Sequence, residues 1–162
     1  MNIRKETDYS TMFAALDAAV TAGLPQIELY RRIGEIICKR TEKGAAVAAA
    51  KYLAEKHPEM AGFSPRNVRR MRDFWRMYGD TPELLAEVIL LNWTQNVVIM
   101  EAELTMTERR WYIRQAAEGD LSKTELLRMI ESAAHSEIPL DENGQDWYTK
   151  ENDEFPERMQ HE

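Results

Sequence analysis

The sequence predicts an all-α protein, a single multi-helix domain with a helix-turn-helix or winged-helix-like unit and an acidic C-terminal tail. Through most of the chain, apolar residues recur at the three- and four-residue spacing of amphipathic helices. Residues typical of helix starts and ends separate these segments. Alternating, strand-like runs are scarce, with room for one short wing hairpin near residues 91–106. With 162 residues, of which 44% are hydrophobic, the chain is long enough to bury a core.

The first three helices are expected over residues 9–22, 25–39 and 44–57. Gly23 ends the first helix, and Pro25 suits the start of the second. The third segment is rich in alanine, the strongest helix former, and Pro58 prevents its simple continuation.

Five further helices are expected over residues 64–78, 81–91, 92–100, 107–119 and 122–134. Asn92 with Gln95 resembles a capping box, and Ser122 with Glu125 forms a clear one, so each pair predicts a helix start. Thr107 is expected to cap the helix that follows it.

The contact surface of the protein is predicted to lie on the segment from Gly62 to Tyr78, GFSPRNVRRMRDFWRMY. Ser64 is a good N-cap, and Pro65 suits the first helical position. At 100° per residue, one arc of the helix faces a core and carries Val68, Met71, Phe74, Trp75 and Tyr78. The opposite side carries Arg66, Arg69, Arg70, Arg72 and Arg76. Five arginines and one acid, Asp73, give the segment a charge of +5 − 1 = +4.

Phosphate is the ligand that such an arginine face suits, so these five arginines are the candidate DNA-binding residues. The preceding helix and the short Gly-containing turn predict a helix-turn-helix, with the arginine helix as its recognition helix. Two simpler interpretations remain open. The face could be a solvated one with intrahelical ion pairs, and the two helices could be an ordinary helical hairpin.

Four stretches resemble a known family: LYRRIGEII (29–37), GFSPRNVRRMRDFW (62–75), LNWTQNVVIM (91–100) and ERRWYIRQAAEGDLSKTELLRMI (108–130). In this order and spacing they look like the YhcG-type N-terminal domain, a bacterial helical module usually found ahead of a PD-(D/E)XK nuclease domain. The resemblance covers about residues 24–132. It implies a winged-helix-like DNA-binding module that works with a nuclease.

The chain departs from the family pattern in two respects. Thr94 and Gln95 stand where the family often has Ser-His, so a role for that histidine is not expected. A PD-(D/E)XK core needs an acid-x-Lys triplet to hold a divalent metal, and no Asp-x-Lys, Glu-x-Lys or Gln-x-Lys occurs in these 162 residues. We therefore expect no nuclease activity and no enzymatic function.

Charge divides the chain into a body, residues 1–134, and an acidic tail, residues 135–162. The tail carries −7, equal to the charge of the whole chain, so the body sums to zero. Residues 79–106 contain five acids and no base. A second function therefore stays open, a protein-interaction or inhibitor protein that binds a basic partner through its tail and this acidic face. Trp147, Tyr148 and Phe155 among the tail acids suit a docking segment, whereas the composition also suits a solvated extension.

No other chemistry is predicted. The three histidines and Cys38 share no metal-ligand spacing, and no phosphate or dinucleotide loop motif occurs, so neither a metal nor a cofactor is expected. Cys38 is expected to be a small core residue. The first residues lack an apolar signal, and no segment is apolar enough for a membrane span, so a cytoplasmic protein is expected. Trp111 and Tyr112, among Arg109, Arg110 and Arg114, predict helix packing with an outward charged face.

Overall fold

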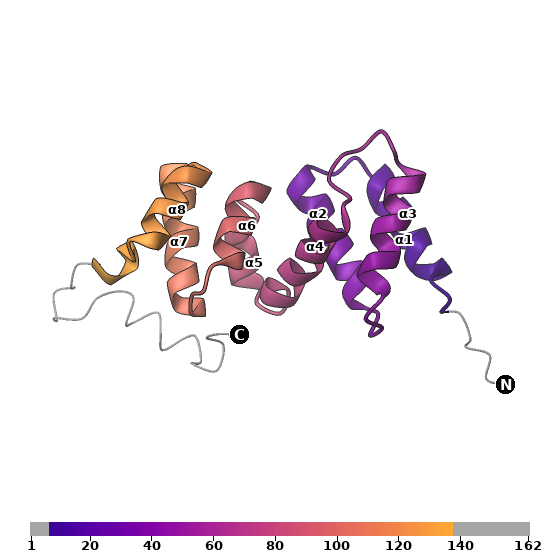
Figure 1. Ribbon diagram of the computed structural model, residues 1–162, viewed down its shortest axis with the longest axis horizontal. Helices are drawn as coiled ribbons and strands as arrows, with labels where there is room; N and C mark the ends of the chain where they lie inside the picture. The colour runs from indigo at the N-terminus through magenta and orange to yellow at the C-terminus, as the bar shows by residue number, and fades with distance from the viewer. Residues whose placement is uncertain (1–6, 138–162) are drawn as a thin grey trace. The chain divides into compact units, whose positions relative to one another are not determined.

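The computed structural model describes residues 7–137, and this part of the chain is helical with no strand (Figure 1). Its elements are α1 Ser10–Thr21, α2 Gln26–Cys38, α3 Ala45–Lys56, α4 Pro65–Tyr78, α5 Pro82–Val88, α6 Trp93–Glu101, α7 Met106–Gly119, α8 Lys123–Glu131 and the 3-10 helix η1 Ala134–Glu137. The all-α class is confirmed. The short wing hairpin for which the sequence left room near residues 91–106 is not formed, because α6 occupies most of that segment.

The chain divides into two compact units, the first ending at Pro82 and the second beginning at Glu83. In the first unit, α4 packs against α2 and α3, and α1 lies against α2 and α3. The core between these helices is formed by fully buried side chains from all four of them. The largest are Leu16, Ile33, Ile37, Leu53, Met71, Phe74 and Tyr78. The four helix positions expected from the sequence are confirmed to within two residues at each end.

α1 and α3 are also joined by a polar contact at their surface. The Tyr52 hydroxyl donates a hydrogen bond of 2.5 Å to the Asp17 carboxylate, and His57 Nε2 lies 3.1 Å from the same carboxylate. The hydrogen bond from Tyr52 is the main cause that lowers the pKa of Asp17. The ring of Phe13 stacks on that of Tyr52, with centroids 4.1 Å apart. This cluster ties the end of α3 to α1, immediately before the turn that leads into α4.

The second unit contains α5 to α8 and η1, and three of its helices begin with a local cap. Capping boxes at Asn92 with Gln95 and at Ser122 with Glu125 are confirmed. The expected cap at Thr107 is wrong. Thr105 caps α7 through a capping box with Glu108, and Thr107 lies buried inside the first turn. The largest fully buried side chains of this unit are Leu84, Ile99, Tyr112, Ile113 and Leu126.

The basic face expected around Trp111 is not an outward face. The packing of Trp111 and Tyr112 is confirmed, but Arg109 and Arg110 are buried, 6% and 9% exposed. Arg109 donates hydrogen bonds to the carbonyl oxygens of Ile99, at 3.2 Å, and Ala102, at 2.9 Å. The Arg109 guanidinium therefore donates to backbone carbonyls of α6 and of the loop after it. A charge pattern along α7 does not reveal such contacts.

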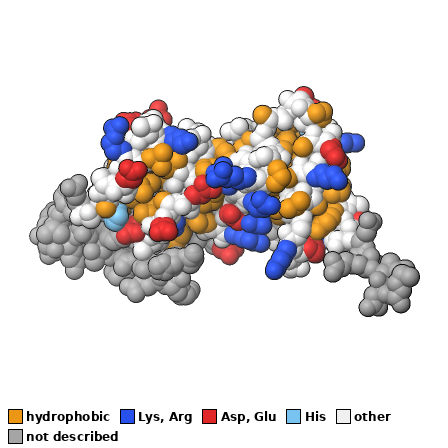
Figure 2. Space-filling model, viewed as in Figure 1, with side chains coloured by type: hydrophobic (Ala, Val, Ile, Leu, Met, Phe, Trp, Pro, Cys, Tyr) orange, Lys and Arg blue, Asp and Glu red, His pale blue; other side chains and the backbone are white. Residues whose placement is uncertain are grey.

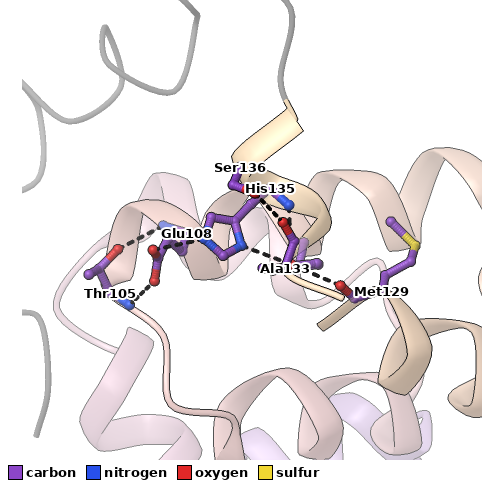
Figure 3. A network of polar contacts seen from close by, with 7 residues as sticks. Thr105, Glu108, Met129, Ala133, His135 and Ser136 are labelled. Atoms are coloured by element: carbon purple, nitrogen blue, oxygen red, sulfur yellow. Dashed lines mark hydrogen bonds and ion pairs between the residues drawn. The ribbon is translucent and has the colours of Figure 1, made fainter. Parts of the chain in front are cut away.

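The C-terminal end of the described chain is held against α7 by a polar network (Figure 3). His135 Nε2 lies 3.0 Å from the Glu108 carboxylate, and His135 Nδ1 lies 2.9 Å from the Tyr112 hydroxyl. Glu108 also accepts a hydrogen bond of 2.8 Å from the Thr105 backbone N–H. The first three residues of the predicted tail, 135–137, therefore belong to the 3-10 helix η1, which contacts α7. The rest of the predicted tail, residues 138–162, lies outside the described part of the chain.

Candidate nucleic-acid interface

The start of α4 is built by the turn that precedes it. The Ser64 hydroxyl accepts a hydrogen bond of 3.1 Å from the Asn67 N–H, which confirms Ser64 as the N-cap and Pro65 as the first helical residue. Asn67 Nδ2 donates a 2.7 Å hydrogen bond to the Gly62 carbonyl. Gly62 has a φ of +97°, and a Cβ built on it would lie 2.2 Å from the Tyr30 hydroxyl oxygen, so the turn requires glycine.

The two faces of α4 follow the pattern expected from the sequence. Val68, Met71, Phe74 and Tyr78 are fully buried in the first unit. Trp75, expected on the same arc, is only half-buried, and the Arg31 guanidinium lies 5.9 Å from the centre of its ring. Arg31 in turn pairs with Glu28 at 3.1 Å. The buried face is therefore confirmed, with Trp75 at its edge under a cation–π contact.

The five arginines lie on α4 in two states. Arg66, Arg69 and Arg76 are exposed, whereas Arg70 and Arg72 are half-buried. Figure 2 shows Lys and Arg side chains, with acidic ones beside them, over the part of the molecule where Figure 1 labels α4. All five arginines lie on the same helix. The half-buried Arg70 and Arg72 offer less guanidinium surface to a binding partner than the three exposed arginines do.

Asp73 neutralises part of this face. Its carboxylate lies 3.0 Å from Arg72 Nη2 and 4.0 Å from Arg76 Nη1. Arg66 and Arg69 form no ion pair within residues 7–137. Intrahelical pairing therefore accounts for Arg72 and Arg76 and leaves Arg66 and Arg69 without an ion pair to side chains of the described part.

Cys38 lies beside this face rather than in the core, where it was expected. Its side chain is only partly buried, and its thiol donates a hydrogen bond of 3.5 Å to the Arg72 carbonyl. Burial raises the pKa of the Cys38 thiol, against the opposing attraction of Arg76 and Arg72. The thiol therefore stays protonated at neutral pH and serves as a small packing group between α2 and α4.

The helices α3 and α4 pack against each other and are joined by residues 57–64. This connection is longer than the tightest helix-turn-helix turns. Its apolar residues Met60 and Phe63 line, with α3, a groove that sequence reasoning did not single out. A run of Pro58, Met60 and Phe63 between two polar-faced helices is the sequence signal that could have indicated it.

The acidic segment 79–106 does not behave as one face. Asp80 belongs to the first unit and the other four acids to the second. Glu87 accepts hydrogen bonds from Arg110, the shortest 2.7 Å, and its carboxylate lies 3.4 Å from Arg114 Nε. Although burial would raise the pKa of Glu87, the hydrogen bonds and charges of Arg110 and Arg114 outweigh it and lower that pKa. Glu87 is thus a structural partner of α7.

Within residues 7–137, no helix combines the length and the apolar character that a membrane crossing requires. In the same part of the chain, no three His, Cys, Asp or Glu side chains gather in a metal-binding arrangement.

Comparison with known proteins identifies the family. The model of the DUF1016 N-terminal domain matches residues 13–137, which include α4 and the larger part of each unit. No curated protein and no solved structure matches significantly. This family is the YhcG-type N-terminal domain that the sequence motifs resemble, and the match suggests a nuclease-associated module. The chain belongs to the DUF1016 N-terminal domain family.

Proposed function

We propose that this protein is a non-catalytic DNA-binding accessory module that contacts phosphates through the arginine face of α4 and works with a separate nuclease. The observation that carries the proposal is the placement of Arg66 and Arg69. Both are exposed on the first turns of α4, and neither has an ion pair within the described residues.

Electrostatics favours a polyanion as the ligand of this face. The face carries five arginines and one acid, and that acid is 3.0 Å from Arg72. Guanidinium groups bind phosphate oxygens through paired N–H donors, so exposed arginines on one helix suit the repeated phosphates of a nucleic acid. Such a surface also attracts DNA over a distance of about 10 Å at 0.1 M salt.

The mechanical support of α4 suits the same role. Its buried face is fixed by four fully buried side chains, and its first turn is fixed by Ser64, Asn67 and Gly62. A binding helix that is held in this way keeps its arginines at set spacings, so less conformational entropy is lost when they contact phosphates. The arrangement of α3 followed by α4 supports a helix-turn-helix mode of approach, with α4 as the contacting helix.

The test is a titration of labelled duplex DNA with the full chain, followed by fluorescence anisotropy over a series of salt concentrations. We expect Arg66→Ala/Arg69→Ala to weaken binding and to lower the slope of log K against log salt by about 0.9 for each lost phosphate contact. Single-stranded and branched DNA, titrated in parallel, define the form of DNA preferred.

The matched control is Lys123→Ala/Arg128→Ala, which removes two exposed cations from α8. It lowers the net charge equally but leaves α4 intact, so its affinity and slope should stay close to those of the parent. If the α4 variant and the control bind alike, α4 is not the contact surface. If the parent binds no DNA at low salt, the alternative function as a protein-interaction or inhibitor protein replaces the proposal.

A further inference from the structure

A shallow groove lies in the first unit between α3 and the connection that leads from α3 to α4. It has a volume of about 420 Å³, and seven of its nine lining residues are apolar. Figure 2 shows hydrophobic side chains at the surface over the part of the molecule where Figure 1 labels α3. Val47, which lines the groove, leaves 46% of its surface exposed, although valine is usually buried. The groove therefore presents apolar surface that residues 7–137 leave uncovered.

The floor of the groove is a straight stripe along α3. The lining residues of this helix recur at the three- and four-residue spacing of one helix face, and they are Val47, Ala50, Lys51 and Ala54. From Val47 to Ala54 the helix rises by about 10 Å, close to two turns. The two alanine side chains are small, so the axis of a docked helix can approach that of α3 to about 8 Å. The shape of the groove fits an amphipathic helix whose apolar residues follow the same spacing.

The charges at the groove are positive. Lys51 belongs to the lining, and Arg66 directly follows Pro65, another lining residue. Both cationic side chains are exposed, and neither forms an ion pair within residues 7–137. Glu55 and Glu59, the nearest acids along the chain, do not line the groove. A helix docked on the stripe removes water from the Lys51 ammonium, and an acidic group on that helix gives the ammonium a partner in place of the water.

A second copy of this chain fits the groove less well than a different protein does. Two α3 helices packed antiparallel about a twofold axis would bring the middle of one stripe against the middle of the other. Lys51 lies in the middle of the stripe, between Val47 and Ala54, so the two ammonium groups would face each other. Like charges in such a contact are unfavourable. A separate protein that carries acids beside its apolar residues avoids this repulsion.

We propose that the groove binds an acidic amphipathic helix of a separate protein. The apolar residues of that helix pack on Val47, Ala50 and Ala54, and its carboxylates meet Lys51 and Arg66. The binding site lies wholly within the first unit. The docking goes beyond the proposed DNA contact and does not depend on it, although the two surfaces share Arg66.

The test uses a fluorescein-labelled helical peptide of about 18 residues, which is about five turns long. Leucine recurs in it at every third or fourth position, glutamates flank the leucines, and alanines fill the rest. The two control peptides have lysine in place of every glutamate, or the same composition shuffled so that the apolar stripe is lost. In anisotropy titrations with the full chain, we expect the acidic amphipathic peptide to bind at least about tenfold more tightly than either control. The whole chain carries −7, so long-range attraction by itself favours the lysine peptide.

Two pairs of variants locate the contact, and circular dichroism checks that each variant keeps its helices. Ala54→Trp fills the groove and should weaken binding of the acidic peptide by about tenfold or more. Ala14→Trp, at an exposed alanine of α1 that does not line the groove, should leave that binding unchanged. Lys51→Glu should weaken binding of the acidic peptide and strengthen binding of the lysine peptide. Lys56→Glu, an equal change of charge at an exposed residue of α3 outside the groove, should do neither.

The expected result is a monomeric chain that binds the acidic peptide through the groove. Equal affinities for the acidic and lysine peptides would overturn the proposal, and so would binding that neither Ala54→Trp nor Lys51→Glu weakens. Sedimentation equilibrium of the chain alone tests the second copy. A dimer that Ala54→Trp dissociates would assign the groove to self-association and overturn the proposal. Because these measurements contain no DNA, their failure is distinct from failure of the proposed DNA binding.

Discussion

The α-carbon of Gly34 on α2 lies directly against the backbone carbonyl of Met71 on α4. A Cβ built on Gly34 would stand 2.1 Å from the Met71 oxygen and 3.2 Å from the Trp75 Cβ. Real Cβ atoms do not approach an oxygen so closely, and the obstacle is backbone that cannot rotate away. This contact sets how closely α4 lies on α2, and therefore how the arginine face is held.

Gly34→Ala should accordingly destabilise the first unit. An added methyl group must push α2 and α4 apart, and overpacking of this kind costs about 3 kcal/mol. Urea unfolding followed by circular dichroism measures the loss of unfolding free energy.

Gly44→Ala is the matched control for this prediction. Gly44 has ordinary helical backbone angles, and its built Cβ would lie 3.5 Å from the Tyr9 hydroxyl, which is normal contact. Its effect should be at most about 1 kcal/mol. Equal effects of the two substitutions would mean that the helices separate without cost.

Glu87→Gln should destabilise the second unit at neutral pH. The change removes the charged partner of Arg110, which is only 9% exposed, and loss of a hydrogen bond to a charged group costs about 1–3 kcal/mol. The pKa of Glu87 is lowered from its ordinary 4.5 in the folded protein, so its stabilisation is present above pH 4.5. It is lost as the pH falls through the folded-state pKa.

The stability gap between the parent and Glu87→Gln should therefore be full near pH 7 and shrink below pH 4.5. Urea unfolding at several pH values measures the gap. Glu83→Gln, on the exposed side of the same helix, should show little gap at any pH. A gap that is independent of pH would show that packing, and not the ion pair, is the source of the effect.

Asp73→Asn should strengthen DNA binding. The substitution releases Arg72 and Arg76 from their shared carboxylate and removes one repulsive charge from the arginine face. We expect an increase in affinity of about three- to tenfold at low salt, which fades as salt rises. Asp80→Asn removes an exposed acid of the same unit outside α4 and serves as control. Weaker binding by Asp73→Asn would mean that Asp73 positions the arginines for contact.

The purified chain should leave DNA intact in the presence of Mg²⁺ or Mn²⁺. This expectation follows from the absence of an acid-x-Lys triplet in the 162 residues, since two-metal or one-metal hydrolysis needs carboxylates to hold the ion. Incubation with duplex, single-stranded and branched DNA, analysed on denaturing gels, measures it. Metal-dependent cleavage that one carboxylate substitution abolishes would contradict the prediction.

Local features of this protein were predictable from the sequence because their causes are local. Ser64 with Pro65, and the capping boxes at Asn92 and Ser122, satisfy backbone N–H groups within one turn, so neighbouring residues decide where these helices begin. The buried face of α4 was predictable for a related reason, since its apolar spacing matches the helical period. The family could also be recognised from the sequence, because its motifs are continuous stretches of residues.

Other features depended on partners far away in the chain, which only the tertiary structure brings together. Arg109 and Arg110 look like surface charges along α7, yet they are buried against the carbonyl of Ile99 and the carboxylate of Glu87. The need for glycine at position 34 comes from Met71, 37 residues later. The groove of α3 arises where a loop folds back on a helix. The energies of such contacts depend on the distance between the partners and on their burial. Neither quantity can be read from the order of residues along the chain.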